Sequence, residues 1–400
     1  MRLKIASLAV VAGLALVAVA TSASGTQKFD PGVTARTVHI GGTFPFTGPA
    51  ASYGAIPKAE LAYFQYVNGR GGVNGRKIQF TFYDDAYDPS KAVPATQKLV
   101  EQDKIFADFG ALGTANIIAT RSYLNKKKVP QVLVASGASY WATEAKKYPW
   151  TIGWQPDYPG EAKIYAKFIN DKVKQAKVGI LYQNDAYGTD FLNAFKAGLS
   201  DQSKIVATQS YDVTATSLTQ QVVALKAAGA NTFVLVSTPI PTITALVTAT
   251  KIGWHPITFV NNVSGNPAYM AAAAKGGAAV EGAITAGYIF DPNNPPFATK
   301  PPALLAKKIL DNYAGGATIF NTNNIYGLAS AWTFVEALKR AGNPPTRAGL
   351  MKALRTMDYR NNPWLYPGFR VKTTPTDAFC VPCHSDCPVV RLRRWEEMRL

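Results

Sequence analysis

The chain has 400 residues, of which 47% are hydrophobic and 17% are charged, a balance that can bury large cores and excludes an intrinsically disordered protein. Lysine and arginine outnumber aspartate and glutamate by 42 to 25, which gives a formal net charge of +17. These basic residues are scattered, and because no zinc finger or aromatic-studded basic strand accompanies them, the sequence favours a solvated basic surface over a nucleic-acid partner.

The first 25 residues have the pattern of a secretory signal peptide. Arg2 and Lys4 precede the uncharged apolar run ASLAVVAGLALVAVA, and small residues that suit cleavage follow it. A membrane anchor is the alternative, but it needs about 20 apolar residues, and this run gives way to Thr and Ser too early. A lipid anchor would need a cysteine at the cleavage site, and no cysteine precedes residue 380. We therefore expect a signal peptide at 1–25, a linker at 26–35 and a periplasmic or otherwise secreted protein.

After the linker, the chain alternates between short β-rich runs and longer helical patterns. The patterns predict strands at 36–42, 76–85, 105–110 and 130–136, and helices at 53–68, 89–102 and 116–128. This βαβ order predicts a parallel sheet with helices on both faces. The fold class is therefore α/β, and a first doubly wound lobe is expected to begin with residues 36–154.

A second cycle of the same kind follows, although no sequence repeat relates it to the first. It predicts helices at 157–173, 187–199, 217–229 and 241–253, and strands at 176–183, 204–212, 231–237 and 256–262. We interpret residues 155–287 as a second doubly wound lobe. At this chain length, two domains are expected rather than one.

Beyond residue 287 the alternation of predicted strands and helices ends. A loop rich in Pro and Asn follows, and then three helical stretches at 302–315, 324–342 and 347–357. The second of these carries an apolar stripe at three- and four-residue spacing, formed by Leu328, Trp332, Val335 and Leu338. Such a stripe is typical of a helix packed on a core. We therefore expect residues 288–358 to return to the first lobe and residues 359–379 to complete the second.

All three cysteines lie in the stretch CVPCHSDC near the C-terminus. Cys380, Cys383 and His384 have the C-x-x-C-H spacing of a c-type haem attachment site, and the three thiols with the histidine would alternatively suit zinc. A haem site also needs an apolar pocket and usually a second axial ligand, which a short terminal tail does not supply. We expect neither a cofactor nor a metal, and we interpret residues 380–400 as an atypical tail outside the fold, such as a shifted reading frame would produce.

Two other motifs have structural interpretations. The glycine-rich stretch GRGGVNG at 69–75 closes a predicted helix and precedes a strand, which is the reverse of a phosphate loop, so we interpret it as a helix end and turn. Asp84, Asp85 and Asp88 in YDDAYD lack the further oxygen ligands of a calcium loop. No G-x-S-x-G or H-E-x-x-H motif is present, which lowers the expectation of an enzyme.

Four stretches together resemble the branched-chain amino-acid binding protein family, which are type I periplasmic solute receptors of ABC importers. They are GGTFPFTGPAASYG, VNGRGGVNGRKIQFTFYDDAYDPSKAV, FADFGALGTAN and NDAYGTDF, and the resemblance runs from residue 37 to residue 379. It implies two Rossmann-like lobes joined by three crossovers, with a ligand cleft between them that closes by hinge bending. It also implies a monomeric receptor, a small-molecule ligand with a carboxylate, and an ABC permease as the membrane partner.

The resemblance also places candidate ligand-binding residues. In doubly wound lobes, ligands bind beyond the carboxyl ends of strands, where helix N-termini offer free N–H groups. By similarity, Thr114 and Ser139 match positions whose hydroxyl and N–H groups hold a ligand carboxylate, although ordinary helix capping would also explain them. Aromatic residues in the same loops, including Trp141, would either wall an apolar pocket or pack between the domains. The predicted ligand-binding residues are Tyr53, Thr114, Gly137, Ala138, Ser139, Tyr140, Tyr158 and Asn262.

Two departures from the family pattern bear on the ligand. An acidic residue in the second lobe of amino-acid-binding relatives pairs with the ligand ammonium, and the matching stretch FVNNVSG offers Asn262 instead. Because an uncompensated ammonium in a closed cleft costs several kcal/mol, we hypothesise a carboxylate ligand without a charged amine, such as an aromatic or branched aliphatic acid. A first-lobe disulfide of some relatives falls on Tyr87 and Gly113, so both of its cysteines are replaced together.

Two alternative functions belong to other classes. A sensory receptor domain shares this fold, but a sensor is expected to carry a transmembrane helix and an output domain. A nucleotide-dependent oxidoreductase would need G-x-G-x-x-G directly after the first strand, and GGTFPFTG does not provide it. We therefore expect a non-catalytic receptor that captures a solute and delivers it to an ABC permease.

Overall fold

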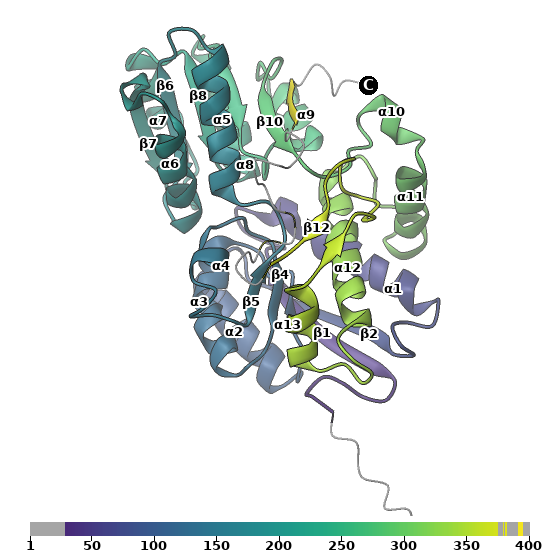
Figure 1. Cartoon of the computed structure of the whole chain (residues 1–400). Coiled ribbons are helices and arrows are strands. Elements are labelled where there is room, and N and C mark those ends of the chain that lie inside the picture. Colours follow the sequence, from purple (N-terminus) through teal and green to yellow (C-terminus); the bar gives the residue numbers. More distant parts are fainter. Residues whose placement is uncertain (1–28, 375–378, 380, 382–390, 395–400) are drawn as a thin grey trace, which may run out of the picture.

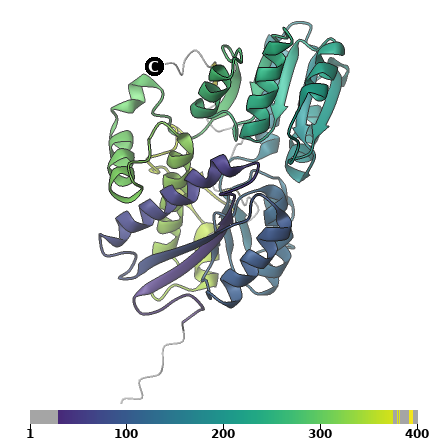
Figure 2. The same ribbon diagram turned by 180° about the vertical axis from the view of Figure 1, so that it is seen from behind.

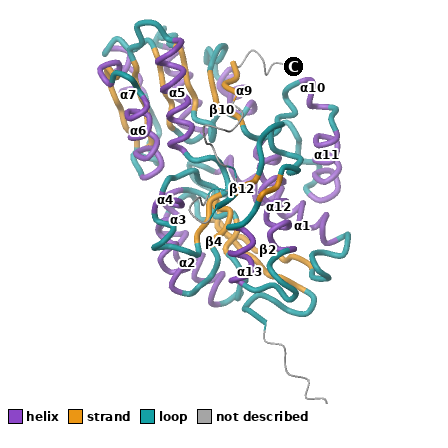
Figure 3. Tube along the Cα trace, in the orientation of Figure 1, coloured by secondary structure: helices purple, strands orange, loops and turns teal. Residues whose placement is uncertain are grey.

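The computed structural model describes residues 29–374, 379, 381 and 391–394, and these residues form two α/β lobes (Figure 1). The predicted signal peptide at 1–25 lies outside the described residues, as do Cys380, Cys383, His384 and Cys387. Among the helices that are described, none is both long enough and apolar enough to cross a membrane. Figure 3 shows the strands of each lobe flanked by helices, which confirms the predicted fold class.

Lobe 1 is built on a sheet with the strand order β2-β1-β3-β4-β5, in which every pairing is parallel. Its strands are β1 (Thr37–Phe44), β2 (Lys77–Asp84), β3 (Asp108–Phe109), β4 (Gln131–Val134) and β5 (Thr151–Gly153). The connections contain a 3₁₀ turn (Ala51–Gly54) and the helices α1 (Ala55–Asn68), α2 (Pro89–Glu101), α3 (Thr114–Lys126) and α4 (Tyr140–Thr143). Sequence patterns predicted these elements apart from β5 and α4.

Lobe 2 repeats the same topology, with the order β13-β10-β9-β8-β6-β7. Its strands are β6 (Val178–Gln183), β7 (Ile205–Tyr211), β8 (Thr232–Val236), β9 (Ile257–Val260), β10 (Ile284–Gly287) and the antiparallel edge strand β13 (Arg391–Arg394). Its helices are α5 (Tyr158–Lys172), α6 (Ala186–Gly198), α7 (Thr219–Ala227), α8 (Pro239–Lys251) and α9 (Pro267–Lys275), with a 3₁₀ turn at Gln202–Lys204. In both sheets the strand order reverses beside the first strand, which is where doubly wound proteins bind ligands.

The chain returns to lobe 1 after β10. The returning elements are α10 (Pro295–Ala298), α11 (Pro301–Tyr313), α12 (Thr322–Lys339), α13 (Arg347–Leu354) and the two-stranded β11 (Asp358–Tyr359) and β12 (Val371–Lys372). Helices α11 and α12 pack against α1, the purple helix that crosses lobe 1 in Figure 2. The predicted stripe on α12 faces the core, because Leu328, Val335 and Leu338 are fully buried and Trp332 is half-buried.

Aromatic packing joins α12 to the lobe 1 sheet. Phe109 on β3 has its ring centroid 5.0 Å from Phe334 on α12 and 5.4 Å from Phe64 on α1. All three side chains are fully buried. Rings at these separations contribute about 1 kcal/mol per pair beyond the area that they bury, so the C-terminal helices are part of the lobe 1 core.

The structure differs from the predicted placement of residues 359–379 in the second lobe. Trp364 packs edge-on against Tyr63 of α1 with centroids 5.6 Å apart, and Asn362 donates a hydrogen bond to the Ala329 carbonyl of α12 (2.9 Å). This part of the chain therefore covers lobe 1. The physical reason is the large apolar surface of Trp364, which is buried only where α1 and α11 meet.

The structure also differs from the expectation that the fold stops near residue 379. Phe379 pairs with Gly153, and Val381 is fully buried with its N–H donating to the Trp154 carbonyl (2.9 Å). Residues 391–394 then form β13 at the edge of the lobe 2 sheet, where Ala286 pairs with Leu392. A single edge strand lacks the periodicity by which longer elements are recognised, so local patterns did not indicate it.

The glycine-rich and acidic motifs have the structural roles that the sequence suggested. Gly72 has φ +74°, and a Cβ there would lie 2.0 Å from the Arg76 carbonyl oxygen, so this turn between α1 and β2 requires glycine. Asp84 accepts hydrogen bonds from the N–H groups of Phe46 and Thr47 (2.8 and 3.2 Å). Asp88 caps the N-terminus of α2. These aspartates therefore shape loops of lobe 1.

Candidate functional site

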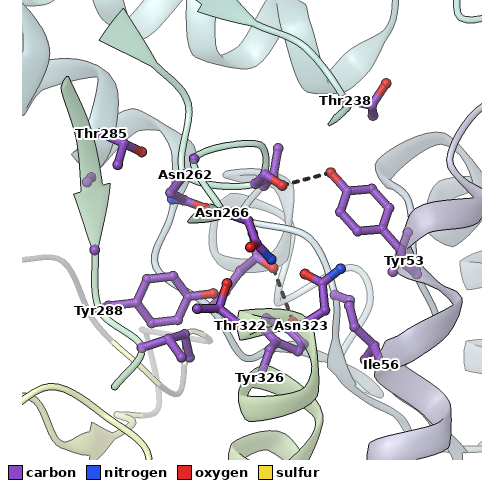
Figure 4. A pocket seen from close by; sticks show the side chains of 18 of the residues that line it. Tyr53, Ile56, Thr238, Asn262, Asn266, Thr285, Tyr288, Thr322, Asn323 and Tyr326 are labelled. Carbon is purple, nitrogen blue, oxygen red and sulfur yellow. Dashed lines mark hydrogen bonds between the residues drawn. The ribbon is translucent and has the colours of Figure 1, made fainter. Parts of the chain in front are cut away.

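A cavity of about 120 Å³, partly open to solvent, lies between the lobes, where the carboxyl ends of the two sheets meet (Figure 4). Lobe 1 supplies the loops that follow β1, β2, β3 and β4, and lobe 2 supplies the loops that follow β8, β9 and β10. The N-terminal turns of α5, α6, α9 and α12 complete the wall. Seven tyrosines line the cavity, namely Tyr53, Tyr87, Tyr158, Tyr187, Tyr288, Tyr326 and Tyr366.

Four of the predicted ligand-binding residues line this cavity: Tyr53, Thr114, Tyr158 and Asn262. Tyr53 is 6% exposed, and its hydroxyl donates across the cleft to the carbonyl oxygen of Val263 (3.0 Å), as the dashed line in Figure 4 shows. The hydroxyl groups of Thr114 and Ser136 lie 2.8 Å apart, which fixes the Thr114 side chain at the start of α3. Tyr53 and Asn262, which are 209 positions apart in the sequence, therefore line the same cavity.

The other four predicted residues, Gly137, Ala138, Ser139 and Tyr140, are not among the lining residues. The Gly137 carbonyl accepts a hydrogen bond from the Tyr158 N–H (2.6 Å), so this loop supports the cavity wall from behind. Ser139 donates its N–H and its hydroxyl to the Asp190 carboxylate of lobe 2 (2.8 and 2.6 Å). The Ser139 donors, which we expected to hold a ligand carboxylate, are therefore already bonded to a carboxylate of the protein.

Tyr87 and Gly113, the positions at which some relatives carry a disulfide, are also in contact here and both line the cavity. A Cβ on Gly113 would lie 2.8 Å from the Tyr87 ring, and Gly113 has φ +101°. A side chain at residue 113 would therefore clash with this ring and strain the backbone. The Tyr87 ring occupies the space that a side chain at residue 113 would need, so the tyrosine at 87 and the glycine at 113 are compatible as a pair.

The cavity wall is polar but almost uncharged. Its described lining contains no Lys, Arg or His, and Asp291 is its one carboxyl group. Burial raises the pKa of Tyr158 and Tyr187, so their hydroxyls stay neutral at physiological pH. Helix α3 begins at the wall, at Thr114, without a side-chain cap. The free N–H groups and the positive dipole end of this helix favour an anionic group without any basic side chain.

A buried carboxyl group lies directly behind the lobe 2 wall. Glu161 on the first turn of α5 is 1% exposed, and its Oε1 accepts hydrogen bonds from the Tyr165 hydroxyl (2.6 Å) and the Asn262 N–H (2.7 Å). Its Oε2 accepts from Asn261 Nδ2 (2.6 Å) and Asn262 Nδ2 (2.5 Å). Burial raises the pKa of Glu161 to about 8, and the hydrogen bonds from Tyr165 and Asn262 oppose this rise.

Several lining residues escaped the sequence analysis. Thr238 directly follows a predicted strand, so the rule that ligands bind at carboxyl ends would have found it. Thr285 and Tyr288 lie on or after β10, a strand too short for its pattern to stand out. Asn323 and Tyr326 come from α12 of the returning segment, and only the tertiary structure brings them to the site.

The chain is similar to known proteins over most of its length. A model of the family described as periplasmic binding protein matches residues 37–383. The Leu/Ile/Val-binding protein homolog 3 of Brucella melitensis is 28% identical over 165 residues, which are 41% of this chain and 44% of the relative. The chain thus matches less than half the length of that curated relative.

Solved structures share the fold over most of the chain. A fatty acid ABC transporter substrate-binding protein from Thermomonospora curvata has a TM-score of 0.76 at 21% identity, covering 93% of this chain and 96% of that chain. A branched chain amino acid ABC transporter protein from Thermus thermophilus with bound valine has a TM-score of 0.75 at 19% identity, covering 86% of this chain and 91% of that chain. At these identities the likeness shows the fold alone.

Proposed function

Because this chain belongs to the periplasmic binding protein family, as a type I member of the branched-chain amino-acid binding group, we propose that it is the solute-binding component of an ABC importer. It captures a small carboxylate-bearing ligand by closure of its two lobes, in the periplasm or otherwise outside the cytoplasmic membrane, and delivers it to a membrane permease. The observation that carries this proposal is the cavity at the carboxyl ends of both sheets. The protein acts as a monomer and performs no catalysis.

The ligand carboxylate binds at the N-terminus of α3. Thr114 is 2% exposed and lines the cavity, and the preceding Gly113 provides no side-chain cap for the helix. The unpaired N–H groups of the first helical turn therefore remain available for an anion. No lysine or arginine of the described lining competes for this role.

The pocket volume of about 120 Å³ is somewhat smaller than a cavity of about 150 Å³ that is known to hold benzene. Because the pocket is partly open to solvent, a branched-chain or other small amino acid, or a short aromatic or aliphatic acid, extends from it toward the opening. The Leu/Ile/Val-binding relative supports the same range of sizes. A long-chain acid would require the lobes to open further.

A thermal-shift screen of amino acids and short carboxylic acids tests the proposal, followed by calorimetry on the ligands that stabilise the protein. A ligand that binds the folded state at 100 times its Kd raises stability by about 2.7 kcal/mol, which is readily measured. We expect Thr114→Val to weaken the tightest ligand by about tenfold, because the lost hydroxyl leaves the carboxylate with one donor fewer. Thr216→Val, at an exposed residue of lobe 2, is the matched control. A screen without any stabilising carboxylate, or equal binding by the Thr114 variant, would contradict the proposal.

A further inference from the structure

Asn262 presents one end of its side-chain amide to the protein and the other end to the cavity. Its Nδ2 donates to Glu161 Oε2 (2.5 Å), while its backbone N–H donates to Glu161 Oε1 (2.7 Å). Within the described part of the chain, no donor contacts Asn262 Oδ1, and Asn262 lines the cavity (Figure 4). The amide therefore turns its nitrogen toward Glu161 and leaves its oxygen, a hydrogen-bond acceptor, for a ligand.

The surroundings of Glu161 fix this orientation. Glu161 Oε1 accepts from the Asn262 N–H, and Oε2 accepts from the Asn261 and Asn262 side chains. The Tyr165 hydroxyl has a single hydrogen, which it shares between Glu161 Oε1 and the Val260 carbonyl. If the Asn262 amide rotated by 180°, its oxygen would face Oε2 and two acceptors would be in contact in a site that is 1% exposed. Such a buried repulsive contact is costly, so the ionised carboxylate permits one amide orientation.

We propose that Glu161 is a positioning residue that holds Asn262 as a hydrogen-bond acceptor in the cavity, and that the ligand therefore places a hydrogen-bond donor, an ammonium or a hydroxyl group, against Asn262 Oδ1. The inference rests on the proposed receptor function and narrows its ligand class to carboxylates that also carry such a donor. It replaces the hypothesis, drawn from the sequence of this loop, of a ligand without an amine. A plain carboxylic acid would bury the Asn262 oxygen without a partner, whereas an amino or hydroxy acid would satisfy it.

Above its pKa of about 8, the negative charge of Glu161 favours the same ligands. The described lining contains no basic side chain that would neutralise this charge, and Asp291 adds a further carboxyl group to the wall. A donor with a positive charge is therefore attracted to the lobe 2 side of the cavity. A hydroxyl group makes the same hydrogen bond without this attraction, so the two donor types separate the hydrogen bond from the charge effect.

Three ligands that share one carbon skeleton test the inference: leucine, 2-hydroxy-4-methylpentanoate and 4-methylpentanoate. Calorimetry at pH 8.5 keeps Glu161, with its pKa of about 8, mostly ionised. We expect the full-length protein to bind at least one of the two donor-bearing ligands about tenfold more tightly than 4-methylpentanoate. Phenylglycine, mandelate and phenylacetate form an equivalent aromatic series.

Glu161→Gln reverses the polarity of the site. The fixed Asn262 N–H requires the oxygen of the glutamine at Oε1, which places its NH₂ group opposite the Asn262 side chain. Asn262 then turns its own oxygen toward residue 161 and its nitrogen toward the cavity. The preference for donor-bearing ligands is expected to fall below twofold, with binding of the plain acid kept or improved. Glu101→Gln, at an exposed surface of lobe 1, is the control and leaves the preference unchanged.

A double-mutant cycle with Asn262→Val distinguishes positioning from a general structural effect. Asn262→Val removes the acceptor at the cavity surface and remains informative if the Glu161 variant folds poorly. If Glu161 acts through Asn262, then Glu161→Gln causes no further loss of preference in the Asn262→Val background. Additive losses, or an unchanged preference in Glu161→Gln, would overturn the inference.

The same data separate this inference from the proposed function. Equal binding of the plain acid and its donor-bearing partners by the unmodified protein overturns the inference and leaves the receptor function intact. If neither series binds, the same comparison is made with the carboxylate that stabilises the protein in the thermal-shift screen and with its hydroxy and plain counterparts. A screen without any stabilising carboxylate overturns the proposed function, and the inference with it.

Discussion

Asp108 in lobe 1 and Glu161 in lobe 2 are both buried carboxyl groups, and the two lobes surround them in opposite ways. Asp108 on β3 is 1% exposed, and within the described residues neither of its oxygens has a hydrogen-bond partner. Gln131 opposes the rise in the Asp108 pKa without reaching hydrogen-bond geometry. Glu161 is equally buried but accepts three hydrogen bonds from Asn261 and Asn262, and it shares the Tyr165 hydroxyl hydrogen with the Val260 carbonyl. Burial raises the pKa of both acids, to about 7 for Asp108 and about 8 for Glu161, and Glu161 in addition orients the groups that donate to it.

The largest expected effect tests the isolated acid. Burial raises the pKa of Asp108 from 3.8 to about 7, so the folded protein binds this proton more tightly than the unfolded chain. The resulting stability is fully present below about pH 4 and is lost as the pH rises through 7. Asp108→Asn should therefore remove about 3 kcal/mol of the fall in unfolding free energy between pH 5 and pH 8.5.

Urea denaturation at the two pH values measures this difference, with the exposed Asp311→Asn as the control. Buried Glu60, Asp85 and Glu161 also have raised pKa values, so part of the pH dependence should persist in the Asp108 variant. An unchanged pH dependence would show that Asp108 is solvated or paired in solution.

The second effect contrasts the two acids directly through replacement by leucine. Glu161→Leu leaves the Asn262 N–H and the side-chain amides of Asn261 and Asn262 without acceptors. The Tyr165 hydroxyl can still donate to the Val260 carbonyl (2.7 Å). We expect the unfolding free energy at pH 8.5 to fall by about 2 kcal/mol. Asp108→Leu removes a carboxyl group that has no partner and should be neutral or stabilising at the same pH. Equal destabilisation by the two substitutions, measured by urea denaturation, would remove the contrast between the lobes.

The smallest effect concerns Asp190, a third carboxyl group, whose hydrogen-bond partner lies in the opposite lobe. Ser139 of lobe 1 donates two hydrogen bonds to Asp190 of lobe 2, so the pair stabilises the arrangement of the lobes that forms the cavity. Asp190→Ala should weaken the tightest ligand of the screen by about fivefold, which corresponds to about 1 kcal/mol, and should change the unfolding free energy little. Calorimetry with Asp171→Ala, an exposed residue of α5, as the control tests this expectation. If Asp190→Ala lowers the unfolding free energy but leaves the ligand affinity unchanged, then Asp190 stabilises lobe 2 and does not stabilise the contact between the lobes.

The candidate site was only partly predictable from local sequence. Thr114 and Asn262 follow predicted strands, and both line the cavity, as the binding rule for doubly wound lobes indicates. Ser139 follows a strand equally closely, yet its donors are bonded to Asp190. Nothing in the sequence near Ser139 indicates Asp190 as a partner, because the two residues meet only when the lobes face each other. Glu161 was missed for a related reason: its hydrogen bonds reach residues that are 100 and 101 positions away.

The order of strands and helices was determined by the sequence itself, because hydrophobic periodicity, glycine turns and capping residues act over a few neighbouring positions. This order was enough to predict two doubly wound lobes and to place the ends of their strands. Tertiary structure alone decided that Trp364 packs on lobe 1, that residues 391–394 close the edge of lobe 2, and that Glu161 orients Asn262. These contacts join distant residues, and they depend on which surfaces remain unburied after the two sheets have formed.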